Sequence, residues 1–262
     1  MRRIDRARAV VLGLLVLPLL CAYRTAAADE LNVAVAANFS GPLQRLAASY
    51  RQATGTQLVI SAGSSGQLYA QITQGAPFDV FLSADTEKPR LLEAAGLALP
   101  GSRFTYAIGT LALWSPKDGV VDAQGAVLRA GAYRYIGVAD PGNAPYGTAA
   151  QQVLSSLGLW TTLNRDGKVV LGENITQTWQ FAATGNVDLA FVALSQIIGA
   201  DGAVSGSSWL PPQSLYTPIL QDAVVLARGS HRSAAEAFAS WLQHDAGAAA
   251  AIRSAGYRLT PP

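Results

Sequence analysis

The chain has 262 residues, half of them hydrophobic, and a formal net charge of +2 from 19 Lys and Arg against 17 Asp and Glu. A single cysteine excludes a disulfide framework and a zinc site built from thiolates, and the nearly balanced charge argues against a nucleic-acid-binding surface. The length is sufficient for one large domain or two small ones with a substantial core.

Residues 1–28 have the pattern of a secretory signal peptide. Four arginines lie within residues 2–8, an apolar run spans 9–20, and three alanines at 26–28 provide a small-residue cleavage site. The run is shorter than the ~20 residues that span a bilayer, so a retained membrane anchor is the less favoured alternative. Cys21 follows Leu20 instead of a small residue, and we therefore expect it to be removed with the signal and not lipidated.

The mature chain is expected to be an exported protein without disulfides. It would keep 234 residues, with 14 basic and 16 acidic side chains and a formal net charge of −2. Its stability then has to come from a hydrophobic core, and nucleic acid is not an expected partner.

Strand patterns alternate with helical ones in the first half of this chain. The apolar runs at 31–38, 57–63 and 78–84 predict three strands. Helical spacing follows each strand, and the third helix is expected over 86–96. This βαβαβ order predicts a parallel sheet covered by helices.

The segment 104–116 interrupts the pattern, because it is longer than an ordinary strand of ~5–6 residues. We interpret it as a crossing from one domain to another. The remaining predicted segments are strands at 133–141, 168–174 and 187–193, a helix ending at Gly158, helices at 176–184, 231–244 and 246–255, a return crossing at 216–228, and loops at 101–104 and 205–214. Two α/β lobes joined by two crossings leave a cleft, and ligands of open α/β sheets bind beyond the carboxyl ends of the strands.

Four strand-to-helix junctions carry the same kind of sequence. They read "AANFSGP" (36–42), "AGSSGQL" (62–68), "GNAPYGTA" (142–149) and "GENITQT" (172–178). The first N–H groups of a helix have no partner inside the helix, and the helix dipole adds positive potential there, so such ends bind anions. Ser, Thr and Asn are also ordinary helix caps, which is the simpler explanation for each junction taken alone.

None of the four junctions contains Lys, Arg or His. A site of neutral donors can hold a fully ionised oxyanion by spreading its charge over many N–H and O–H dipoles. Such a site offers few acceptors, so an anion that keeps a proton would leave that proton unpaired, at a cost in affinity.

The segments "VAVAANFSGPLQRLAASYRQATG", "SAGSSGQLYAQITQGAPFDVFLSAD", "VADPGNAPYG" and "GENITQ" resemble the periplasmic molybdate-binding proteins of ABC importers, in order and over nearly all of the mature chain. The "AANF" opening is similar to a subgroup that has asparagine where others have serine. The resemblance implies a two-lobed periplasmic binding protein fold of type II, with a mostly parallel sheet flanked by helices in each lobe. It places residues 29–108 and 217–262 in lobe I and 109–216 in lobe II.

The resemblance also implies the ligand-binding residues, which are Ala37, Asn38, Ser65, Tyr146 and Ile175. Ser65 would donate its O–H and N–H, Asn38 its side-chain amide and main-chain N–H, and the other three mainly main-chain N–H groups. Ser64 and Asn174 would shape the loops. The ligand would be molybdate, and tungstate as well, bound without a cofactor or a direct metal-cation ligand.

One departure concerns a tyrosine whose hydroxyl touches the ligand in some members of the family. Ala193, Leu194 and Ser195 stand at that place in this chain. The sequence leaves open whether Tyr146 or Ser195 replaces this hydroxyl. The partners implied by the resemblance are the oxyanion and a membrane permease, with the binding protein itself a monomer.

Three alternatives remain at this point. The ligand is another tetrahedral oxyanion such as sulfate, the protein is a secreted serine hydrolase using Ser65, or it is an exported structural domain. The hydrolase is disfavoured because "GSSG" lacks the G-x-S-x-G pattern. In addition, the two histidines, His231 and His244, are both expected on C-terminal helices and not beside a nucleophile.

Overall fold

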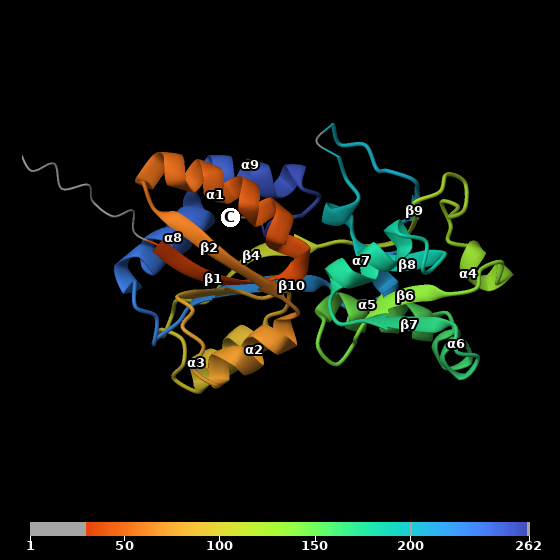
Figure 1. The fold of residues 1–262 in the computed structure, drawn as a ribbon, viewed down its shortest axis with the longest axis horizontal. Helices are drawn as coiled ribbons and strands as arrows, with labels where there is room; N and C mark the ends of the chain where they lie inside the picture. The colour runs from red at the N-terminus through yellow and green to blue at the C-terminus, as the bar shows by residue number, and fades with distance from the viewer. Residues whose placement is uncertain (1–29, 200, 261–262) are drawn as a thin grey trace, which may run out of the picture.

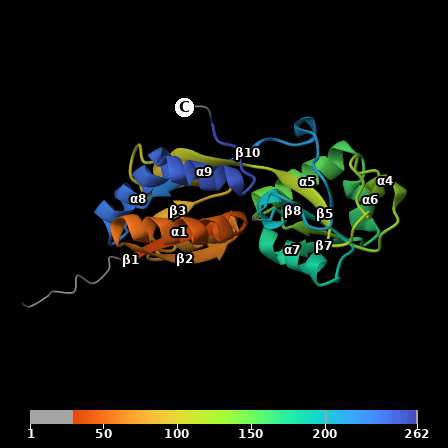
Figure 2. The same ribbon diagram turned by 90° about the horizontal axis from the view of Figure 1, so that it is seen from above.

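The computed structural model describes residues 30–199 and 201–260. The predicted signal peptide at 1–28, with Cys21, lies outside these residues. Two five-stranded sheets, each with its own helices, lie side by side in both views of the molecule (Figure 1, Figure 2). Within the described ranges, no helix has the length and hydropathy needed to cross a membrane.

The first sheet has the strand order β2-β1-β3-β10-β4. Its strands are β1 (Glu30–Ala36), β2 (Gln57–Gly63), β3 (Val80–Leu82), β4 (Phe104–Gly109) and β10 (Ile219–Val225). Its helices are α1 (Ser40–Thr54), α2 (Ser65–Thr73), α3 (Glu87–Ala94), α8 (Arg232–His244) and α9 (Ala246–Ser254). We call this half lobe I.

Successive side chains of β1 point to opposite faces of this sheet, as in any β-strand. Val33 and Val35 belong to the core under α1, α8 and α9, whereas Ala34 belongs to the core under α2 and α3. The helices therefore cover both faces (Figure 1), and the carboxyl ends of β1, β2 and β3 all point toward the other half.

The second sheet has the order β7-β6-β8-β5-β9. Its strands are β5 (Leu111–Ser115), β6 (Ile136–Ala139), β7 (Val169–Gly172), β8 (Leu189–Ala193) and β9 (Ser207–Trp209). Its helices are α4 (Val127–Ala130), α5 (Pro145–Ser156), α6 (Trp160–Arg165) and α7 (Ile175–Ala183). Short 3-10 turns complete the elements at η1 (Ala37–Phe39), η2 (Leu194–Gln196) and η3 (Gln213–Leu215). We call this second half lobe II. The turn η1 lies between β1 and α1 and therefore belongs to lobe I.

The prediction of two α/β lobes joined by crossings is confirmed. The segment 104–116 contains two strands in two different sheets, β4 and β5, separated by Thr110 alone. The run at 216–228 returns the chain to lobe I as β10. The lobe limits at 108/109 and 216/217 stay a prediction.

The sheets are more mixed than the expected mostly parallel ones. The β1–β2, β1–β3, β6–β7 and β6–β8 pairs are parallel, but β10 runs antiparallel to β3 and β4, and β5 antiparallel to β8 and β9. The reason is connectivity, since β5 and β10 arrive from the opposite lobe, against the direction of their neighbours.

Several predicted limits differ from the structure. The strand predicted to Asn38 ends at Ala36, because residues 37–39 turn into η1 at the start of α1. The predicted loop at 205–214 contains β9 and η3. Trp209 accounts for the extra strand, since it is buried and pairs with Leu113 of β5, which places β9 at the edge of the sheet.

Candidate functional site

The four donor junctions meet at one small cavity between the lobes. Its lining contains all five predicted site residues and is made of Ala36, Ala37, Asn38, Gly63, Ser64, Ser65, Ala84, Ala144, Pro145, Tyr146, Asn174 and Ile175. The cavity volume is about 10 Å³, enough for the centre of one small ion and not for a sugar or an amino acid.

Each predicted residue stands at the start of a helix. Ala37, Ser65 and Ile175 are the first residues of η1, α2 and α7, and Tyr146 follows Pro145 at the start of α5. Main-chain N–H groups at these positions have no acceptor inside their own helix. The site therefore gathers unpaired donors from both lobes.

Side-chain caps at two of these helices leave the first N–H group free. Ser64 Oγ accepts from Gln67 N at 3.3 Å, and the Gln67 amide accepts from Ser64 N at 3.3 Å, which is a complete capping box on α2. Asn174 Oδ1 accepts from Thr176 N at 2.9 Å and from Gln177 N at 3.0 Å. Capping and anion binding thus use different N–H groups of the same helix.

The Ser65 hydroxyl is left free to donate. Ala84 N donates to Ser65 Oγ at 2.9 Å, and the side chain is 1% exposed. Because the oxygen already accepts a hydrogen bond, its own proton remains available for an acceptor in the cavity.

The Asn38 side chain is hydrogen-bonded within the protein. Its Nδ2 donates to Gln221 Oε1 at 2.9 Å and to Tyr257 Oη at 3.0 Å, which uses both amide hydrogens inside the protein. Neither η1 nor α1 has a side-chain cap, so capping does not explain this asparagine either. The main-chain N–H of Asn38 is the donor that remains for a ligand.

The hydroxyls of Tyr146 and Ser195 are bonded within the protein as well. Gln221 Nε2 donates to Tyr146 Oη at 3.2 Å, and Ser195 Oγ donates to Asn38 O at 3.0 Å. Tyr257 Oη lies 2.9 Å from Ser195 Oγ and 2.8 Å from Asn38 O. Burial raises the pKa of Tyr146 well above its ordinary value and that of Tyr257 to about 12, so both phenols are neutral at physiological pH.

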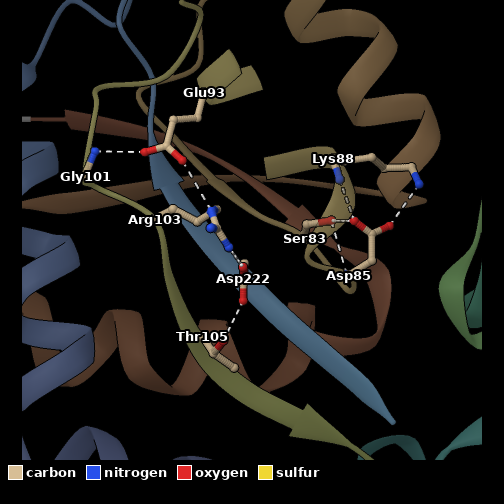
Figure 3. Close-up of polar contacts among 8 residues, drawn as sticks. All are labelled: Ser83, Asp85, Lys88, Glu93, Gly101, Arg103, Thr105 and Asp222. Carbon is tan, nitrogen blue, oxygen red and sulfur yellow. Dashed lines mark hydrogen bonds and ion pairs between the residues drawn. The ribbon is translucent and has the colours of Figure 1, made fainter. Parts of the chain in front are cut away.

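The lining of the cavity carries no charge, because it contains no Lys, Arg, His, Asp or Glu. Its polar groups are mainly the N–H donors at the helix starts and the Ser65 hydroxyl. A larger groove of about 350 Å³ lies beside it and includes Asp85, Glu87 and Lys88. Asp85 pairs with Lys88 at 2.9 Å and accepts from Ser83 at 3.2 Å (Figure 3). With two carboxylates, this groove is unsuited to a dianion.

The hydrolase alternative finds no catalytic pair at Ser65. His231 Nδ1 lies 3.1 Å from the buried carboxylate of Asp79, whose other oxygen accepts from His231 N at 3.0 Å. The lining around Ser65 contains no histidine that could act as its base.

The sequence did not point to Tyr106, Gln221 or Tyr257, which together with the hydroxyl of Tyr146 form the polar layer behind the cavity. All three are buried, and Gln221 has no exposed surface. The pair Gln221-Asp222 inside the apolar run of β10 was the available signal, since polar residues in a buried strand need partners.

Comparison with known proteins places the chain in a family. The profile of the bacterial extracellular solute-binding proteins matches residues 31–258. The molybdate-binding protein ModA of Rhodobacter capsulatus is 49% identical over 218 residues, covering 83% of this chain and 84% of the relative. The ModA protein of Azotobacter vinelandii is 47% identical over 234 residues, covering 89% and 92%.

A solved structure agrees with these relatives. The periplasmic molybdate-binding protein of Azotobacter vinelandii superimposes with a TM-score of 0.87 at 47% identity, over 88% of this chain and 100% of that chain. The chain belongs to the bacterial extracellular solute-binding proteins and, among them, to the family of the ModA molybdate-binding proteins.

Proposed function

We propose that this protein captures molybdate between its two lobes in the periplasm and delivers it to the membrane permease of an ABC importer. One observation carries the proposal. The interlobe cavity presents first-turn N–H groups of helices from both lobes and the Ser65 hydroxyl, with no charged side chain in its lining. The molybdate-binding relatives and the signal-like segment at 1–28 support the same function.

The five site residues would hold the anion as dipoles. Ala37, Asn38, Tyr146 and Ile175 would donate main-chain N–H groups, and Ser65 would donate its N–H and its free O–H. A tetrahedral dianion has acceptors on every side, and donors aimed from two lobes can spread its charge without a counter-ion.

Selectivity would come from size and protonation. Tungstate nearly equals molybdate in size and charge and is expected to bind as well. Sulfate is smaller and would reach fewer donors at once. Phosphate that keeps a proton would place it against donors only, which leaves a buried group unpaired.

Isothermal titration of the purified mature protein tests this function. Molybdate and tungstate should bind at one site per chain, with sulfate and phosphate much weaker. A thermal-shift screen gives an independent reading, because a hundredfold excess over Kd stabilises the native state by about 2.7 kcal/mol. Equal affinity for sulfate and molybdate would overturn the selectivity, and no response to any of the four anions would overturn the function.

A further inference from the structure

Gln221 lies at the centre of the hydrogen bonds behind the cavity. Its Oε1 accepts from Asn38 Nδ2 at 2.9 Å and from Tyr106 Oη at 3.0 Å, and its Nε2 donates to Tyr146 Oη at 3.2 Å. Asn38 and Tyr106 belong to lobe I, whereas Tyr146 belongs to lobe II. One side chain therefore bonds the ligand loop of each lobe.

An amide is well suited to this position. The oxygen lies within hydrogen-bond distance of two donors of lobe I, the Asn38 amide and the Tyr106 hydroxyl, and the latter also reaches Ser83 O at 3.1 Å. The nitrogen donates across to lobe II. A carboxylate would add negative charge behind a dianion site, and an apolar side chain would leave buried partners unpaired.

Asp222, the residue after Gln221, makes its side-chain contacts within lobe I. The pairing of β10 with β4 shifts register between Gln221 and Asp222. Asp222 accepts from Arg103 at 2.8 Å and from Thr105 at 2.6 Å, and Arg103 also reaches Glu93 at 3.3 Å (Figure 3). None of these contacts includes Gln221 or a residue of lobe II, so they are independent of the contact between the lobes.

Gly109 has no side chain, and this leaves room for Gln221 and for the Tyr146 hydroxyl of lobe II to meet. A Cβ atom on Gly109 would lie 2.6 Å from Gln221 Nε2 and would overlap the Tyr146 hydroxyl. The end of β4 thus lacks a side chain where Tyr146 of lobe II approaches Gln221.

We infer that Gln221 is a positioning residue that couples closure of the lobes to assembly of the anion site. By holding the Asn38 amide, it directs the main-chain N–H of Asn38 toward the cavity. By holding the Tyr146 hydroxyl, it seats the start of α5 against lobe I only when the lobes are closed. The inference rests on the proposed function for its ligand, and on the interlobe contact for its structural part.

Anion binding gives the first test. Gln221→Met keeps the length of the side chain and removes its polar atoms, and it should raise the Kd for molybdate about tenfold, mainly through faster dissociation in stopped-flow displacement. Tyr146→Phe should also weaken binding, and the double variant should be little worse than Gln221→Met alone, because that substitution already removes the bond to Tyr146. Thr105→Val is the matched control, since it removes a bond to the neighbouring Asp222 within lobe I and should leave the Kd unchanged.

A second test needs no ligand. The sequence after residue 28 has no cysteine, so spin labels can be attached through Arg90→Cys on α3 and Ser155→Cys on α5, both exposed. The distance distribution should shift to longer values in Gln221→Met and Tyr146→Phe but not in Thr105→Val.

The two tests separate the two claims. If the parent protein binds none of the anions, the proposed function fails, and the label distances still decide the role of Gln221. A parent-like distance distribution in Gln221→Met overturns the inference, as does a parent-like Kd when the parent binds molybdate.

Discussion

Two adjacent serines at the start of α2 have separate tasks. Ser64 caps the helix through Gln67, while Ser65 accepts from Ala84 N and keeps its proton for the cavity. Ser65→Ala should raise the Kd for molybdate about 10- to 100-fold, because a hydrogen bond to a charged acceptor contributes about 1.5–3 kcal/mol. Titration calorimetry at constant ionic strength measures the change.

Ser64→Ala is the control for this prediction. Loss of the cap should lower the free energy of unfolding by about 1 kcal/mol and change the Kd for molybdate little, as measured by urea unfolding and calorimetry on the same samples. If Ser64→Ala weakened binding as much as Ser65→Ala, the hydroxyl of Ser65 would have no special role.

The positions of the candidate residues at helix starts were predictable, because the signals there are local. The starts of helices follow from motif and spacing, and the residues predicted there line one cavity. The role of the Asn38 amide was not predictable, because its partners Gln221 and Tyr257 are 183 and 219 residues away. Contacts at such separations depend on how the lobes pack, which neither periodicity nor capping patterns describe.

At the scale of elements, helix α2 meets lobe II at its first turn. Gly66 N donates to Asn143 O at 2.9 Å across the lobes. A Cβ on Gly66 would lie 2.8 Å from Asn143 Oδ1 and 3.0 Å from Asn143 Cα, closer than side chains normally pack. The glycine therefore permits the close approach of the two lobes.

Gly66→Ala should separate folding from binding. Alanine favours the helix by up to about 1 kcal/mol, so the free energy of unfolding without ligand should not fall. The Kd for molybdate should nevertheless rise about tenfold, because the lobes cannot close fully. Urea unfolding and calorimetry measure the two quantities.

Gly41→Ala provides the matched control for Gly66→Ala. Gly41 is likewise the second residue of its helix, α1, and a Cβ there would meet only the end of Arg45 at 4.0 Å. Pro42 follows Gly41 and disfavours helical backbone at a preceding residue with a Cβ, so this variant should gain little helix stability while it keeps the parent Kd. An unchanged Kd in Gly66→Ala would show that closure tolerates the added methyl group.

The order of the elements was largely predictable, because buried strands and amphipathic helices have distinct periods. The long run at 104–116 was correctly interpreted as a crossing between lobes. Edge strand β9 was missed, since its three residues lie among turn formers and only Trp209 anchors them. The direction of β5 and β10 within the sheets was not predicted, because it depends on their entry from the other lobe.

At the scale of the whole molecule, hydrogen bonds between the lobes surround the cavity. They run from Gly66 N to Asn143 O (2.9 Å), from Thr176 Oγ1 to Ala37 O (3.3 Å), from Ser195 Oγ to Asn38 O (3.0 Å) and from Gln221 Nε2 to Tyr146 Oη (3.2 Å). Each adjoins a loop proposed to hold the anion. Binding should therefore favour the closed arrangement, since only there do both lobes contribute donors.

The polar layer behind the cavity contains three buried tyrosines from both lobes. Burial raises the pKa of Tyr106 and Tyr146 well above the ordinary value and that of Tyr257 to about 12. In the unfolded chain the same phenols titrate near pH ~10. The native state consequently holds protons that the unfolded state releases above that pH, so native stability is lost as pH rises through this window.

The free energy of unfolding should reflect these protons at alkaline pH. The contribution of the three tyrosines should be fully present up to about pH 9 and then decline above pH ~10 by up to about 1.4 kcal/mol per pH unit for each tyrosine. Urea unfolding at a series of pH values from 8 to about 11.5 would measure this slope. Tyr146→Phe removes one titrating group from the layer, so its slope should be shallower than that of the parent by one proton. Parallel slopes for the two proteins would mean that Tyr146 ionises equally in both states, and that the layer joining the lobes is open to water in solution.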